Sequence, residues 1–415
     1  MLVLKGRVID GNGGEPIEKG AVVIEGKKIL LVCPERECPE YPHAQVISIE
    51  DGTIMPGLIE QHVHMGWGSA TAAHWITSTP QLTMARTLKE LEMLRNSGYT
   101  AIREMGGEAI FLKPAVAEGL LDCPRICGSG KFLTQIGGHG DVYQKITLEA
   151  ITHTFIPGII VTGADEVRRA CRVNARNGAD FIKIMTTGGV FSQGDKATPH
   201  SHFSQEEIRA AVEEAENMGS YVSTHAQANR GIKLALKNGV KSIEHGFYLD
   251  DECIEIMLKN DCYLVPTLSI MHTSKMFFQR QDSSLDYLKE KTYAAYEAHY
   301  RSVERAHQAG VKIGMGCDFL GDEHFGCTYD KATMEIERLE VAGLSPLEII
   351  TSATKIGAEL ILMADQLGTL EVGKLADIIL VKGNPAVDIK LLTSAENIKV
   401  VVQDGKIKKD ILAAG

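Results

Sequence analysis

Two histidines that could bind a metal ion stand at the end of a short apolar run. The segment "MPGLIEQHVHMG", residues 55–66, carries His62 and His64 one residue apart. In an extended strand alternate side chains lie on the same face, so these two imidazoles would lie side by side. Neutral imidazoles arranged in this way can bind one metal ion together. The pair by itself is also consistent with two ordinary polar residues at a strand end.

Four more polar residues occur in or just after other apolar, strand-like runs. The runs "FIKIM", "YVSTHA", "SIEHG" and "KIGMGCD" carry Lys183, His225, His245 and Asp318. Taken singly, a strand-end histidine is more often a hydrogen-bonded structural residue, and an aspartate before a loop is more often a cap. In a barrel of parallel strands, however, the carboxyl ends of all strands meet at one rim. We therefore interpret these residues and the histidine pair as the ligands of one metal site.

Lys183 suggests what kind of metal site this is. Its neighbours Phe181, Ile182, Ile184 and Met185 predict a strand covered on both faces. Burial disfavours the ammonium form and lowers the pKa toward that of a neutral amine. A neutral amine can react with carbon dioxide to give a carbamate, whose two oxygens can bridge two cations and balance part of their charge. The alternative is a lysine that extends to the rim or pairs with an aspartate.

The elements that would position these residues alternate between strands and helices. A capping box at Ser204 and Glu207 predicts the start of one helix. Repeated strand–helix units predict an α/β fold, the (β/α)₈ TIM barrel. The segment between residues 130 and 181 is too long for one helix and predicts an insertion over the barrel mouth. The eight strands are expected at 58–64, 100–106, 125–130, 181–185, 221–226, 242–246, 263–267 and 312–318.

Both ends of the chain contain short strand-like runs. Glu25-Gly26 and Asp404-Gly405 separate pairs of such runs and predict hairpin turns. We expect a small β-sandwich domain built from residues 1–55 and 364–415, and a hydrolase barrel at 56–363.

Composition excludes several classes of protein. The chain has 415 residues, 44% of them hydrophobic, and a net charge of -11, which disfavours nucleic-acid and anionic-membrane partners. We see no signal peptide and no apolar run near the ~20 residues of a membrane-spanning helix. The nine cysteines form no Cys-x-x-Cys pair and are expected to be reduced thiols. We expect a cytoplasmic homo-oligomer acting on a small-molecule substrate.

The ordered set "HVH", "FIKI", "STHA", "IEHG" and "GCD" resembles the amidohydrolase superfamily, in particular its binuclear-zinc branch with a carboxylated lysine. The "TTGGV" after the lysine strand is similar to the metal-dependent dipeptidases and carboxypeptidases that act on Xaa-Pro, Xaa-Arg or Xaa-Lys peptides. Imidazolonepropionase-like proteins are more distant relatives. The resemblance implies one zinc ion on His62 and His64, a second on His225 and His245, a bridging Lys183 carbamate, and Asp318 completing the first site.

A metal-bridging hydroxide would attack a carbonyl, and Asp318 could pass its proton to the leaving nitrogen. His139, in "IGGHGD", resembles the family's loop histidine that donates to the substrate carbonyl. Tyr221, four residues before His225, could help to hold the oxyanion. Arg230 could bind a substrate carboxylate. A turn histidine, a packing tyrosine and a helix-surface arginine are the structural alternatives for these three.

These features predict a metal-dependent hydrolase of an amide or peptide bond in a dipeptide or N-acyl amino acid. A cyclic amide, lactam or carbamate hydrolase with the same site is the first alternative. A catalytically silent metal-binding barrel is the second. A mononuclear deaminase is the third, although "HAQANR" lacks the His-x-x-Glu that is typical of deaminases.

Overall fold

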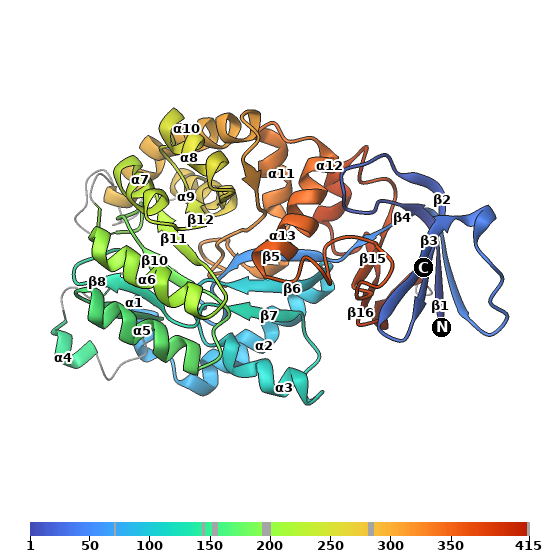
Figure 1. Cartoon of the computed structure of the whole chain (residues 1–415), viewed down its shortest axis with the longest axis horizontal. Coiled ribbons are helices and arrows are strands. Elements are labelled where there is room, and N and C mark those ends of the chain that lie inside the picture. The colour runs from blue at the N-terminus through green and yellow to red at the C-terminus, as the bar shows by residue number, and fades with distance from the viewer. Residues whose placement is uncertain (70–71, 143–145, 152–156, 193–200, 281–285, 413–415) are drawn as a thin grey trace.

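A computed structural model describes residues 1–415 except 70–71, 143–145, 152–156, 193–200, 281–285 and 413–415. Strands from both chain ends form one sheet at one end of the molecule. Parallel strands and the helices around them form the larger part (Figure 1).

The sheet at the chain ends contains seven strands, in the order β17-β16-β15-β4-β1-β2-β3. The predicted turn at Asp404-Gly405 forms, with both residues at positive φ (51° and 69°). Both chain ends contribute strands, as the sequence predicted, but the strands that the structure describes pair as a single sheet and not as a sandwich of two. The strands are β1 (Leu2–Val8), β2 (Ile17–Glu25), β3 (Lys28–Pro34), β4 (Gln45–Pro56), β15 (Ile378–Lys382), β16 (Ile398–Gln403) and β17 (Lys406–Asp410).

All eight strands predicted for the barrel are present, but they are divided between two parallel sheets. The first sheet has the order β5-β6-β7, at Leu58–Val63, Tyr99–Glu104 and Arg125–Gly128. The second has the order β14-β13-β12-β11-β10-β8-β9. Its strands are β8 (Phe132–Gln135), β9 (Gly158–Val161), β10 (Ile182–Met185), β11 (Val222–Ala226), β12 (Ser242–His245), β13 (Tyr263–Val265) and β14 (Lys312–Ile313).

Isolated backbone hydrogen bonds connect the two sheets. At β5, Gln61 N donates to Met315 O at 3.1 Å and Asp318 N to His62 O at 2.9 Å. On the other side Asp180 N donates to Gly128 O at 2.8 Å. The α/β class with parallel strands is confirmed. Because these bonds do not continue as ladders, the described residues do not form a closed barrel. The segment predicted as an insertion over the mouth instead supplies β8 and β9, which extend the second sheet.

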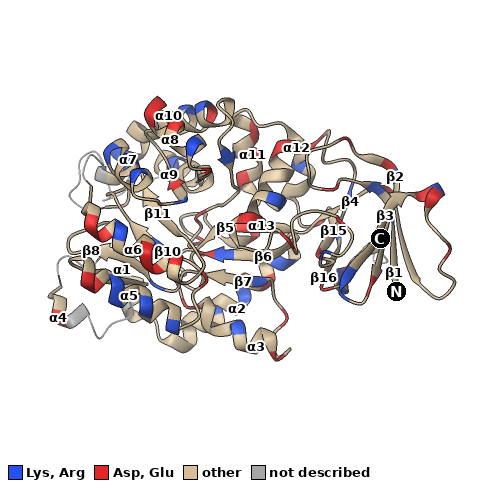
Figure 2. Cartoon of the chain, in the orientation of Figure 1, with Lys and Arg blue, Asp and Glu red and all other residues tan. Residues whose placement is uncertain are grey.

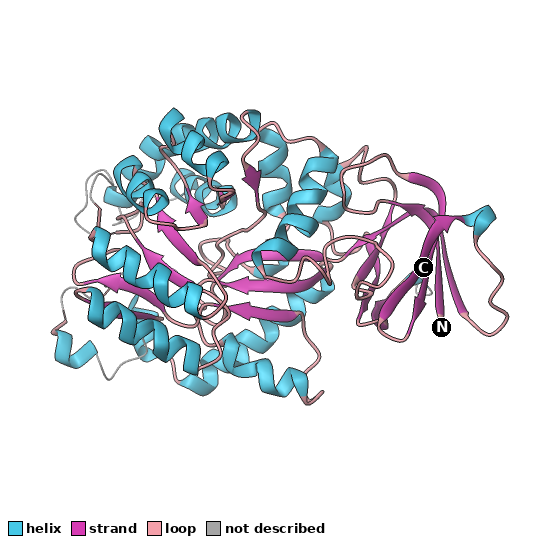
Figure 3. Cartoon of the chain, in the orientation of Figure 1, coloured by secondary structure: helices cyan, strands magenta, loops and turns pink. Residues whose placement is uncertain are grey.

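Helices alternate with the parallel strands and lie around them (Figure 3). The capping box predicted at Ser204 forms and begins α6. The helices are α1 (Ala72–Thr77), α2 (Pro80–Asn96), α3 (Lys113–Ala117), α4 (Leu148–Ile151), α5 (Ala164–Arg176), α6 (Gln205–Asn217), α7 (Asn229–Lys237), α8 (Asp251–Lys259), α9 (Leu268–Arg280), α10 (Asp286–Gln308), α11 (Met334–Val341), α12 (Pro346–Thr351) and α13 (Gly357–Leu360).

Acidic and basic side chains are interspersed over the helices (Figure 2). Among the described residues, no helix combines the length and the apolar character needed to cross a bilayer.

Candidate metal centre

Three side chains with metal-binding atoms converge where β5 ends and the loop after β14 begins. His62 lies in β5, His64 follows the strand directly, and Asp318 lies in the loop. The Nε2 atoms of His62 and His64 lie 3.3 and 3.2 Å from Asp318 Oδ1. One ligand atom from each of the three residues lies within 4.8 Å of the others. Two nitrogen donors and one carboxylate at this spacing can bind a divalent ion.

The second ring nitrogen of each of these histidines is hydrogen-bonded elsewhere. His62 Nδ1 lies 2.8 Å from Glu244 Oε2, and His64 Nδ1 lies 3.1 Å from Gly106 O. Since a carboxylate and a carbonyl can only accept, we place the ring proton of both histidines on Nδ1, which leaves Nε2 free to bind metal. Burial lowers the pKa of His62 to about 4, so this ring is neutral at physiological pH.

Two further histidines come from the ends of β11 and β12. The ring centroid of His245 lies 4.5 Å from that of His225 and 5.2 Å from that of His62. His245 Nδ1 lies 2.7 Å from Thr267 Oγ1, which fixes the orientation of the ring. Burial lowers the pKa of His225 and His245 well below the ordinary value. Two neutral imidazoles therefore stand beside the first three candidate ligands.

An unusual backbone conformation brings His245 to this face. Glu244 pairs with His225 across β12 and β11, so these two side chains share a face, and a regular strand would turn the next residue away. His245 instead has a φ of 74°, in the left-handed region. Thr267 and Asp318, after the next two strands, have φ of 56° and 57°. Left-handed backbone at these positions stores strain, which persists only where the surroundings enforce it.

Lys183 lies in β10 on the same face as His225, because Met185 pairs with His225 in the register of the two strands. Its side chain is buried, and Nζ has no hydrogen-bond partner among the described residues. Burial lowers the pKa of this amine to about 8, although the carboxylates of Glu244 and Asp318 oppose the shift. A buried amine without an acceptor is unusual, and its lowered pKa suits it to react with carbon dioxide.

His139 joins the cluster from the loop after β8. Its ring stacks on that of His225, with centroids 3.9 Å apart and planes at 15°. His139 Nδ1 lies 2.7 Å from Ser192 Oγ, which accepts a hydrogen bond from Gly189 N at 2.9 Å. Because Ser192 already accepts from an amide, we assign its hydroxyl hydrogen to His139 Nδ1, which places the ring proton on Nε2. Burial lowers the pKa of His139 to about 3, so the neutral ring can donate one hydrogen bond.

Tyr221 lies elsewhere, immediately before the first residue of β11. Its hydroxyl donates to Leu360 O at 2.6 Å and accepts from Arg103 Nη1 at 3.1 Å. His225 is near the other end of the same strand. The structure therefore does not bring this hydroxyl together with the histidine cluster, and the predicted oxyanion role has no support from the geometry.

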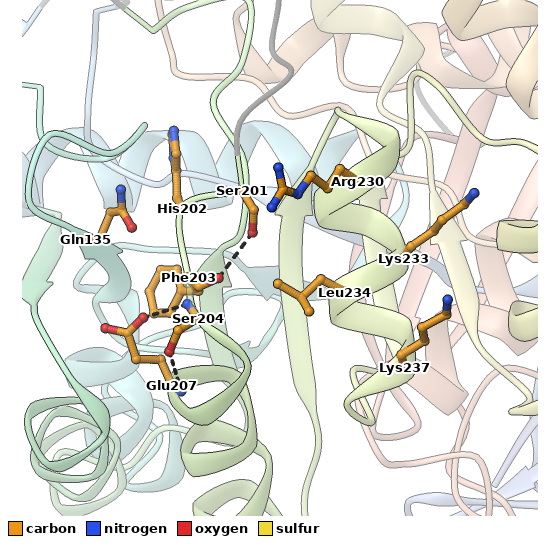
Figure 4. A pocket seen from close by; sticks show the side chains of 10 residues that line it. All are labelled: Gln135, Ser201, His202, Phe203, Ser204, Glu207, Arg230, Lys233, Leu234 and Lys237. Carbon is orange, nitrogen blue, oxygen red and sulfur yellow. Dashed lines mark hydrogen bonds between the residues drawn. The ribbon is translucent and has the colours of Figure 1, made fainter.

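Arg230 lies in the first turn of α7, exposed to solvent. It lines a groove of about 610 Å³ between α7 and the start of α6, with its guanidinium extended toward Ser201 (Figure 4). His202 borders the same groove, and its Nδ1 accepts a hydrogen bond from His139 N at 3.3 Å. The groove that Arg230 lines therefore adjoins the loop that carries His139.

A buried ion pair beneath the histidines was not predicted. Arg103 Nη2 donates to both carboxylate oxygens of Glu244 at 2.8 Å, and Arg103 Nε donates to Gln61 O at 2.7 Å. Burial opposes ionisation of Glu244, but Arg103 and the hydrogen bond to His62 hold its pKa below the ordinary value. The signal was present in the sequence, because "AIREM" and "SIEHG" place opposite charges inside apolar strands, where unpaired charges are rarely buried.

Replacing Arg103 with methionine is expected to lower the free energy of unfolding by about 3–5 kcal/mol, because it leaves the Glu244 carboxylate buried and unpaired. Urea unfolding of the purified variant measures this change. In the double variant Arg103→Met/Glu244→Met the unpaired charge is gone, and most of the stability should return. Activity should stay low in the double variant, because His62 lacks its acceptor. A single variant within about 1 kcal/mol of the parent would contradict the assignment.

The sequence profile of the amidohydrolase family matches residues 53–408, which include all of these parallel strands. The chain belongs to this family, as its motifs predicted. It is 31% identical over 436 residues to ochratoxinase from Aspergillus niger, with 98% of this chain and 86% of the relative covered.

Comparison with solved structures likewise finds similar hydrolases. The structure of a Xaa-Pro dipeptidase with methionine bound in its active site superimposes with a TM-score of 0.88 at 31% identity, covering 98% of this chain and 99% of that one. A prolidase complexed with N-methylphosphonate-L-proline superimposes with a TM-score of 0.90 at 34% identity, covering 99% of each chain. Family and relatives together support a hydrolase that acts on C–N bonds.

Proposed function

We propose that this protein hydrolyses the amide bond of a dipeptide or an N-acyl amino acid at a centre that holds two divalent metal ions. The observation that carries the proposal is the convergence of His62, His64 and Asp318 donor atoms within 4.8 Å of one another. The neighbouring rings of His225 and His245 supply further nitrogen donors.

This donor set fits two cations, and histidine nitrogens with a carboxylate suit zinc. We assign one ion to the three-residue cluster and the second to His225 and His245. Lys183, as a carbamate, would be a further anionic ligand for these ions; its buried amine, which has no hydrogen-bond partner among the described residues, supports this role. When bound, such a pair of ions lowers the pKa of water to near neutrality and polarises a carbonyl.

Asp318 is placed to move the proton. The pKa of this carboxyl lies below the ordinary value although burial opposes ionisation, so the group is a carboxylate. We propose that it takes the proton of the attacking water and delivers it to the leaving nitrogen, because an unprotonated amine leaves poorly.

His139 is the proposed donor to the substrate. With its proton on Nε2, its neutral ring can donate to the carbonyl oxygen and stabilise the negative charge that develops there. The stacking of His139 on His225 places this donor beside the proposed metal ligands.

Arg230 is the proposed partner of the substrate carboxylate. Its exposed guanidinium lines a groove that His202 also borders, and His202 accepts a hydrogen bond from the backbone of His139. The relatives named Xaa-Pro dipeptidase and prolidase support a substrate that ends in an amino acid.

The test is a substrate panel on the holoenzyme. We expect linear dipeptides and N-acyl amino acids to be cleaved faster than lactams, cyclic amides and carbamates. Converting the free carboxylate of a good substrate to a carboxamide should lower kcat/KM about 10- to 100-fold, since a charge-assisted hydrogen bond contributes about 1.5–3 kcal/mol. In Arg230→Met the acid and its carboxamide should be cleaved at similar rates.

Metal analysis accompanies the panel. The purified protein should hold two equivalents of divalent metal, and a chelator should abolish cleavage until zinc is restored. Cleavage that persists after complete removal of metal, or faster turnover of the cyclic amides, would contradict the proposed function.

A further inference from the structure

Asp318 enters the cluster from a segment with little regular structure. The preceding strand, β14, contains only Lys312 and Ile313, and Asp318 itself has left-handed backbone. Its position relative to β5 must therefore be fixed by contacts other than a long strand ladder. The main-chain bond from Asp318 N to His62 O supplies one such contact.

A buried carboxyl group supplies a second contact on one side of Asp318. Glu60 Oε1 accepts hydrogen bonds from His62 N at 3.0 Å and from Cys317 N at 2.9 Å. One oxygen atom thus binds the amide of a proposed ligand and the amide of the residue before another. The Glu60 side chain is fully buried, so water does not compete for this oxygen.

A buried phenol supplies the matching contact on the other side. Tyr329, in the short 3-10 helix Tyr329–Lys331, accepts a hydrogen bond from His64 N at 3.0 Å and donates to Phe319 O at 2.5 Å. It therefore connects the second histidine to the residue after Asp318. The Tyr329 side chain is also fully buried.

We propose that Glu60 and Tyr329 are positioning residues that act as a clamp, holding the ends of β5 and of the Asp318 segment at the spacing that one metal ion requires. The clamp pairs His62 with Cys317 and His64 with Phe319, so it fixes Asp318 from both sides. This proposal rests on the proposed function in one respect, the binding of a metal ion by His62, His64 and Asp318.

The geometry distinguishes the clamp from ordinary packing. Each of the two side chains satisfies backbone groups on two segments that are far apart in the sequence, and those segments carry the proposed ligands. A merely structural hydrogen bond would affect unfolding without changing the affinity of a single metal position. Loss of a side chain that orients metal ligands typically weakens metal binding about 10- to 100-fold.

The test measures metal affinity in Tyr329→Phe and Glu60→Leu by competition with a chromophoric zinc chelator, starting from metal-free protein. We expect one of the two zinc equivalents, the one assigned to His62, His64 and Asp318, to lose affinity about 10- to 100-fold in both variants. Glu60→Gln, which keeps an acceptor oxygen, should bind zinc like the parent. Thermal unfolding of the metal-free variants shows whether the fold is retained.

Tyr263→Phe is the matched control. Its hydroxyl donates to Glu359 Oε2 at 2.9 Å, at the start of β13 and outside the clamp. Unchanged zinc affinity in Tyr329→Phe, or an equal loss in Tyr263→Phe, would overturn the clamp. If Tyr329→Phe does not fold, the clamp is tested by comparing the zinc affinities of Glu60→Leu and Glu60→Gln. Equal affinities in these two variants would overturn the clamp. A parent protein that binds no zinc would instead overturn the proposed function.

Discussion

Replacement of Lys183 with alanine is expected to lower kcat/KM by about 10³-fold or more. The amine lies buried on the face that carries His225, has no acceptor in the part of the chain that the structure describes, and has a pKa lowered to about 8. If its carbamate links the two ions, the variant loses an anionic ligand to both, and the several kcal/mol that metal polarisation contributes to the transition state fall with it. Steady-state kinetics with the best substrate of the panel measure the loss.

Chemical rescue separates this role from a general loss of structure. A short carboxylic acid such as formate could occupy the space of the carbamate, and it should restore part of the Lys183→Ala activity together with the second metal equivalent. Lys312→Ala is the control, because Lys312 pairs with Asp261 and Glu359 at the start of β14, away from the histidines. An alanine variant at Lys183 that keeps two ions and activity within tenfold of the parent would exclude the bridging role.

Asp318→Asn should lower kcat by about 10²–10⁴-fold, the usual contribution of a positioned proton-transfer group. Asparagine has nearly the same shape but cannot take a proton from water at neutral pH. His62 and His64 remain, so substrate affinity should change less than turnover. Separate measurement of kcat and KM tests this difference.

Asp322→Asn removes a carboxylate from the same loop and serves as the comparison. Asp322 Oδ1 accepts from Phe325 N at 2.9 Å, a bond that an asparagine oxygen can keep. Its turnover should stay close to that of the parent. An Asp318→Asn enzyme that retains more than about a tenth of parental kcat would show that another group moves the proton.

The sequence predicted the ligand candidates because their chemistry is local. A polar residue that ends a buried strand is exceptional in that strand, so His225 and Asp318 stood out without knowledge of their neighbours. The sequence analysis did not take account of direction along a strand. Tyr221 shares a face with His225, but four residues at about 3.3 Å each separate them by roughly 13 Å, which places the phenol near the opposite end of the strand.

Pairing between strands that are far apart in the sequence also could not be predicted from local patterns. The register of β5 against the Met315–Asp318 segment depends on single hydrogen bonds, so the predicted closed barrel could not be distinguished from two adjoining sheets. Glu60 and Tyr329 likewise act through backbone groups of distant segments, which no periodicity reveals. The pairing of Arg103 with Glu244 could have been predicted from the sequence, since a charge inside an apolar strand requires a partner.

The left-handed residues at three successive strand ends set a limit on engineering. The left-handed backbone conformation costs of order 1–3 kcal/mol at each of these positions, His245, Thr267 and Asp318. This cost is largest for Thr267, because its side chain is β-branched. Glycine would relieve that cost and raise heat tolerance, but it would remove the very side chains that the conformation presents. Thermal stability and the geometry of the candidate site therefore place opposite demands on these three positions. Stabilising substitutions are better placed in the β-sheet formed by the chain termini.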